Sequence, residues 1–100
     1  MTIEKVTEQN KTTLLLEGWL DTITSPELGE AVDTVGETEE IVLDFDKLEY
    51  ISSAGLRQVV ACKKKADFLG AAFSVVNVGK EVYSIFSLTG LDKKIRILGK

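Results

Sequence analysis

Apolar and polar residues alternate along this chain in short runs whose spacing switches between that of a strand and that of a helix. The run Ile41-Val42-Leu43 is continuous and rich in β-branched residues, which indicates a central strand buried on both faces. Apolar residues spaced at i, i+3, i+4 and i+7 indicate helices between the strands. The predicted strands are Ile3–Val6, Thr12–Leu16, Ile41–Leu43, Ala72–Val76 and Ile95–Leu98, and the predicted helices follow Ser25, run from Ala54 to about Leu69, and lie between Gly79 and Gly90.

Residues with strong preferences for helix ends delimit the first two helices. We expect Ser25 to be the N-cap of the first helix, with Pro26 at its first position and Gly36 as its C-cap. Gly70 stops the second helix. The apolar faces consist of Leu28, Ala31, Val32 and Val35 in the first helix, and of Leu56, Val59, Val60, Ala66 and Leu69 in the second. Lys63 interrupts the second face, so its stem should lie on the core while its amine reaches water.

The order of elements, β-β-α-β-α-β-α-β, predicts an α/β fold. Strands that alternate with helices favour a mixed, mostly parallel sheet with helices packed on it, and the opening hairpin should add one antiparallel edge strand. The polar residues Glu8 to Lys11 form the expected turn of that hairpin. No linker or repeat divides the chain, so residues 1–100 are expected to form one domain. Phe45, Phe73 and Phe86 should lie in its core.

Composition removes several classes of function. The net charge of −4 argues against nucleic acid as a partner. The chain has no histidine and a single cysteine, Cys62, which excludes Ser-His-Asp catalysis, histidine-rich metal sites and structural zinc. Neither a P-loop nor an obvious general base is present, so we expect a binding protein without cofactor or metal, and not an enzyme. Without a signal peptide or an apolar run of about 20 residues, a cytoplasmic protein with no membrane insertion is expected.

Two segments that precede helices carry the distinctive residues, and in parallel sheets such segments lie at the carboxyl ends of strands, where ligands bind. The first is the predicted loop from Glu17 to Thr24, and the second is the predicted loop from Asp44 to Gly55. Ser52 and Ser53 either cap the following helix or form a phosphorylation switch at its N-terminus, which favours negative charge. Asp44 and Asp46 could equally be loop acids that satisfy backbone donors.

Trp19, within the first of these segments, has two interpretations. It either anchors a partner, since tryptophan is enriched at interface hot spots, or it packs beneath its loop. The Lys63-Lys64-Lys65 run is interpreted as a solvated helix face, and Cys62 as a small packed residue.

Three stretches resemble a known family. The segment from Ile41 to Leu56, with Ser52-Ser53-Ala54-Gly55-Leu56 at its end, is similar to the signature region of STAS domains in anti-sigma-factor antagonists. Gly18-Trp19-Leu20-Asp21 resembles the family's Gly-x-Leu/Ile-Asp element. Val78 to Leu91, with Phe86 and Thr89-Gly90-Leu91, is similar to the family's last helix and turn. The resemblance covers almost the whole chain.

The resemblance implies an anti-sigma-factor antagonist that sequesters a serine-kinase anti-sigma factor and so frees a sigma factor. It implies phosphorylation at Ser53 by that kinase and reversal by a PP2C-type phosphatase. Ser52 stands where the family usually has aspartate, so Ser52 remains an alternative for the modified residue. The expected partner-binding residues are Trp19, Asp21, Asp44, Asp46, Ser52, Ser53 and Gly55. The alternative function is a stand-alone STAS subunit of a stressosome-like or phospholipid-transport assembly.

Overall fold

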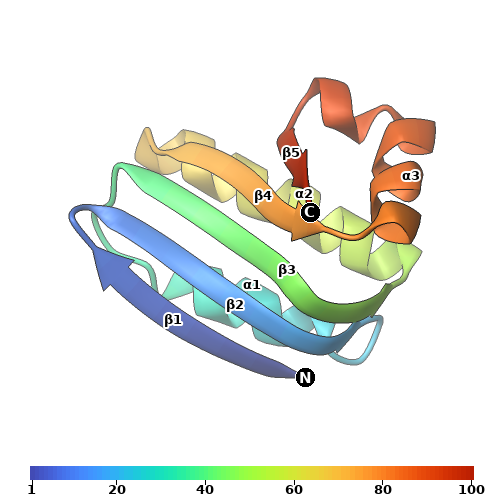
Figure 1. The fold of residues 1–100 in the computed structure, drawn as a ribbon. Helices are drawn as coiled ribbons and strands as arrows, with labels where there is room; N and C mark the ends of the chain where they lie inside the picture. The colour runs from blue at the N-terminus through green and yellow to red at the C-terminus, as the bar shows by residue number, and fades with distance from the viewer.

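Five strands form one sheet in the order β1-β2-β3-β4-β5 in the computed structural model, which describes residues 1–100 (Figure 1). β1 (Thr2–Glu8) pairs antiparallel with β2 (Lys11–Leu20), and all other neighbours are parallel. The remaining strands are β3 (Glu40–Ile51), β4 (Ala72–Val78) and β5 (Arg96–Gly99). The predicted α/β fold, with a mostly parallel sheet and one antiparallel edge strand, is confirmed.

The helices leave one face of the sheet uncovered. α1 (Ser25–Asp33) and α2 (Ser53–Leu69) lie behind the sheet in Figure 1, and its front face carries no helix. The strand order follows the chain order, so successive right-handed crossovers place α1 and α2 on the same side. α3 (Lys80–Thr89) and the short 3₁₀ helix η1 (Leu91–Lys93) lie beyond the end of β4, between it and β5 in the chain.

Alternate strand residues point into the core between the sheet and the helices. The three phenylalanines predicted for the core, Phe45, Phe73 and Phe86, are all buried, and the rings of Phe45 and Phe86 stack with centroids 6.3 Å apart. Ile41, Val42 and Leu43 are buried as predicted. Val42 points to the face without helices, where its register partners Thr13 and Ser74 flank it closely enough to leave it only 4% exposed.

Four strands are longer than the sequence pattern predicts, and the difference is largest in β2 and β3. The predicted loops Glu17–Thr24 and Asp44–Gly55 are wrong, because β2 continues to Leu20 and β3 to Ile51. The two strands stay paired through shifts in register between Leu15 and Glu17 and again between Gly18 and Trp19. Polar residues tolerated at these irregularities resemble loop residues in sequence. The real connections are residues 21–24 and the single residue Ser52.

The ends of α1 differ from the prediction, whereas those of α2 agree closely with it. Ser25 is already helical and Thr24 is the flanking residue, because the preceding turn brings the Ser25 N–H onto the Asp21 carbonyl at 2.8 Å. α1 ends at Asp33 rather than at Gly36, since the Thr34 hydroxyl and N–H donate to the last carbonyls. α2 ends as predicted at Gly70, whose φ of 71° suits glycine.

Lys63 on α2 behaves as expected at its charged end. Its amine reaches the surface and lies 2.7 Å from Asp67 one turn later. No helix of the chain is both long enough and apolar enough to cross a bilayer.

Candidate partner-binding site

The start of α2 separates the roles of the two adjacent serines. The Ser52 hydroxyl accepts a hydrogen bond from the Gly55 N–H at 3.2 Å, and the Ser52 carbonyl accepts one from the Leu56 N–H at 2.9 Å. Ser52 is therefore the N-cap. Ser53 is the first helical residue, it is exposed, and its hydroxyl makes no hydrogen bond within the chain. The capping interpretation thus applies to Ser52 and leaves the Ser53 hydroxyl free.

Gly55 holds the start of α2 against the end of β2. A Cβ atom at this position would lie 2.6 Å from the Leu20 carbonyl oxygen and 2.8 Å from Cγ1 of Ile51. The Ser52 N–H donates to the same Leu20 carbonyl at 2.9 Å. Only glycine permits this approach, which brings the turn after β2 next to the start of α2.

Asp21 organises that turn. Its Oδ1 accepts hydrogen bonds from the N–H groups of Ile23 at 2.9 Å and Thr24 at 3.0 Å, and from the Thr24 hydroxyl at 3.1 Å. These bonds, foremost the one from the Thr24 N–H, lower the pKa of the Asp21 carboxyl group, so it stays ionised. Asp21 is a fixed negative charge one residue beyond Leu20.

Exposed apolar side chains lie on the strand ends and the turn that adjoin this charge. Trp19 and Tyr50 pair across β2 and β3 with ring centroids 5.2 Å apart, and they remain 55% and 47% exposed. The interpretation that Trp19 packs beneath its loop is therefore wrong. Ile23, in the Asp21 turn, is 84% exposed. We call Trp19, Asp21, Ile23, Tyr50 and Ser53 the tip surface.

Sequence reasoning missed Ile23 and Tyr50 as members of this surface. Strand alternation could have found Tyr50, because the next residue, Ile51, is buried in the core and Tyr50 must point the other way. No signal in the sequence distinguishes Ile23 from an ordinary buried isoleucine.

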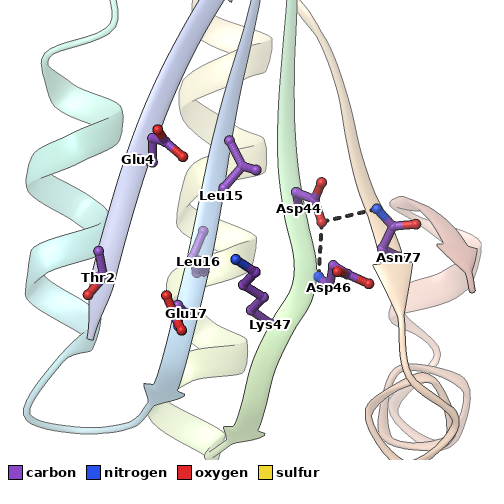
Figure 2. A pocket seen from close by; sticks show the side chains of 9 residues that line it. All are labelled: Thr2, Glu4, Leu15, Leu16, Glu17, Asp44, Asp46, Lys47 and Asn77. Atoms are coloured by element: carbon purple, nitrogen blue, oxygen red, sulfur yellow. Dashed lines mark hydrogen bonds between the residues drawn. The ribbon is translucent and has the colours of Figure 1, made fainter.

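Asp44 and Asp46 lie apart from the tip surface, beside Asn77 of β4 (Figure 2). Both lie within β3, where Asp44 Oδ1 accepts from the Asp46 N–H at 2.9 Å and from the Asn77 side-chain amide at 3.1 Å. Asp46 also lies 3.5 Å from the Lys100 amine. Asp46 lies four positions before Tyr50 along β3, a span of about 13 Å at the rise of a strand. Asp44 satisfies a backbone donor as one interpretation required, but within a strand and not in a loop.

A hollow of about 160 Å³ adjoins Asp44 and Asp46 on the face without helices. Carboxylates of Glu4 and Glu17 share its lining with Lys47 (Figure 2). It is smaller than the 300 Å³ or so at which small-molecule pockets begin. No group of three or more acidic or cysteine side chains in the chain is placed to hold a metal ion. The hollow therefore has neither the size of a ligand pocket nor the geometry of a metal centre.

Similarity to known proteins extends over nearly the whole chain. The family model for the STAS domain matches residues 2–99. An anti-sigma factor antagonist from Mycobacterium paratuberculosis has 26% sequence identity and a TM-score of 0.88, with 99% of this chain and 86% of that chain covered.

Two more distant structures share the fold. A sulfate transporter family protein from Wolinella succinogenes has 15% identity and a TM-score of 0.82, covering 94% of this chain and 80% of that chain. The Bacillus cell fate determinant SpoIIAA, in its phosphorylated form, has 16% identity and a TM-score of 0.67, covering 96% of this chain and 90% of that chain. At these identities the likeness is one of fold.

Proposed function

The chain belongs to the STAS domain family, and we propose that it acts as an anti-sigma-factor antagonist whose binding is switched by phosphorylation at Ser53. The observation that carries this proposal is that the two serines differ in their contacts: Ser52 caps α2, whereas the hydroxyl of Ser53 is exposed and makes no hydrogen bond within the chain. The partner is a serine-kinase anti-sigma factor, and a PP2C-type phosphatase removes the mark. The likeness to the mycobacterial antagonist supports this role.

Phosphorylation at Ser53 acts by electrostatics in this proposal. A phosphate adds about −1.5 to −2 charges at neutral pH, and the N-terminus of α2 favours negative charge, so the domain itself tolerates the group. A partner docked over the tip surface meets that charge beside the carboxylate of Asp21, which is ionised already. The phosphate therefore repels the partner without unfolding the domain. The Ser53 hydroxyl makes no hydrogen bond within the chain, so its modification removes none that stabilises the fold.

The test is a pair of substitutions at Ser53 measured against the cognate kinase. Ser53→Asp should leave the circular dichroism spectrum native and weaken kinase binding at least tenfold, about 1.4 kcal/mol. Ser53→Ala should keep binding but lose incorporation of phosphate from ATP. Ser52→Ala is the control, which should still be labelled and should lose about 1 kcal/mol of stability with its cap.

If labelling is lost in Ser52→Ala and kept in Ser53→Ala, the switch lies at Ser52 and the assignment to Ser53 is wrong. If no serine kinase encoded near this gene labels either residue, the antagonist role is rejected.

A second candidate is a stand-alone STAS subunit of a stressosome-like or phospholipid-transport assembly. The fold that the chain shares with a sulfate transporter family protein supports this second candidate, because one fold can serve in different assemblies. The two roles differ in whether negative charge at Ser53 releases the partner. An antagonist should form a discrete complex with a small ATP-binding kinase that phosphorylation dissolves, whereas an assembly subunit should stay bound when Ser53 is replaced by aspartate.

A further inference from the structure

β3 continues beyond the point where β4 stops pairing with it, and this leaves part of one edge of β3 without a neighbouring strand. β4 pairs with β3 only from Glu40 to Asp44, while β3 continues to Ile51. Backbone groups alternate between the two sides of a strand, so about half of those between Lys47 and Tyr50 point away from β2. No other part of the chain gives them a hydrogen bond. The edge next to α3 is therefore unpaired.

One carbonyl at the start of this edge shows that it accepts donors from outside the sheet. The Lys100 amine donates to the Asp46 carbonyl oxygen at 3.0 Å. The same amine lies 3.5 Å from the Asp46 carboxylate. A side chain that is remote in sequence has thus taken the place where a neighbouring strand would donate.

A groove runs alongside the free edge. It has a volume of about 330 Å³ and lies between the second half of β3 and the first turn of α3. Apolar side chains of Phe45, Leu48 and Val82 line it, and its charged residues are balanced, with Glu49 and Glu81 against Lys80 and Lys100. α3 starts there without a side-chain cap, so the N–H groups of its first turn are not satisfied by a capping side chain.

We propose that this groove binds an extended peptide segment, which adds to the free edge of β3 as a parallel or antiparallel strand. The occupant is a segment of the kinase partner, and in this respect the inference rests on the proposed function. Backbone hydrogen bonds from the edge hold the segment, while an apolar side chain enters between Leu48 and Val82. Since the charges of the groove balance, recognition depends on backbone pairing and one apolar contact, with no strong preference for segment charge.

This occupant fits the groove better than a small molecule does. Strand addition satisfies a row of backbone donors and acceptors spaced along an edge, which a compact ligand cannot span. The edge also ends at Ile51, one residue before the cap of α2, so a partner docked on the tip surface has its chain within reach of the groove.

The experiment uses overlapping 12-residue peptides that tile the cognate kinase, with binding to the whole domain measured by calorimetry. We expect one tile to bind. N-methylation of its backbone should weaken binding at least tenfold at alternate residues and leave the residues between them unaffected, because only alternate N–H groups face the edge. An interaction made by side chains alone would not show this alternation.

A pair of variants on α3 tests the same groove with the intact kinase. Val82→Asp places a charge in the groove and should weaken kinase binding at least tenfold. Leu88→Asp makes the same change on the same helix at a side chain that is 87% exposed and outside the groove, and it should have no effect. The peptide measurement on the unaltered domain decides the question if Val82→Asp fails to fold.

The outcomes separate the two proposals. If the kinase binds in a Ser53-dependent manner but no tile binds, or N-methylation has no alternating effect, the groove is not a strand-addition site and the antagonist role stands. If the kinase does not bind the domain at all, both proposals are overturned.

Discussion

Gly55 lies where the first turn of α2 crosses the end of β2, and it has no room for a side chain. Its missing Cβ would stand 2.6 Å from a backbone oxygen of Leu20, which cannot move without displacing β2. We expect Gly55→Ala to lower the free energy of unfolding by about 1–3 kcal/mol through overpacking, measured by urea denaturation.

Gly29 in α1 is the matched control. A Cβ there would meet the side-chain amide of Gln58 at 3.1 Å, and that side chain can rotate away. Gly29→Ala should therefore gain up to about 1 kcal/mol from helix propensity. A Gly55→Ala variant as stable as Gly29→Ala would show that the close approach of β2 and α2 is not tight in solution.

Single residues were predictable where their surroundings are local. The serines, Gly55 and Asp21 act through bonds or contacts with segments that adjoin each other at one end of the sheet, and the sequence placed all of them at strand-to-helix connections. Asp44 and Asp46 were not predictable in this way. Their position depends on how far β2 and β3 stay paired, which no nearby residue determines.

At the scale of elements, α2 fixes the position of the tip surface through its buried face. Val59, predicted to lie on that face, is fully buried. Val59→Ala should lower the free energy of unfolding by about 1–3 kcal/mol, because it loses burial and leaves a small cavity. Ala61→Gly on the exposed side of the same helix gives the cost of a change in propensity alone. An unchanged denaturation midpoint for Val59→Ala would contradict the observed packing of α2.

The helices and the order of elements along the chain followed from periodicity, whereas the lengths of the strands did not. The apolar run that predicts β3 ends at Leu43, so the sequence pattern predicts that the strand ends there as well. In the structure β3 continues to Ile51 because register shifts opposite β2 accommodate its polar residues. The part of β3 that forms the free edge is therefore a strand because it pairs with β2, which is distant in sequence, and not because of its own residue pattern.

At the scale of the whole molecule, the thiol of Cys62 reports on global unfolding. Burial is the main cause that raises its pKa from 9.0 to about 12. We expect the folded protein to react with a disulfide reagent at about pH 8 only at the rate at which the whole domain opens. Rapid labelling in native buffer would contradict this.

The same pKa fixes the sign of a pH effect. Between about pH 9 and 12 the unfolded thiol has lost its proton and the folded one has kept it, so the unfolded state binds fewer protons. The free energy of unfolding contributed by this group falls as the pH rises through that window. The stability of the wild type should therefore decline relative to Cys62→Ala above about pH 9, as measured by urea denaturation at several pH values.

The agreement between strand order and chain order also governs how the molecule can assemble during synthesis. The hairpin of β1 and β2 leaves the ribosome first, and each later strand joins the edge formed by the one before it. No strand has to insert between two that are already paired. Each newly synthesised strand can therefore pair with the exposed edge of the strand that precedes it in the sequence. Growth from the N-terminus is thus compatible with folding at each step, and the segment most exposed to wrong pairing is always the newest strand.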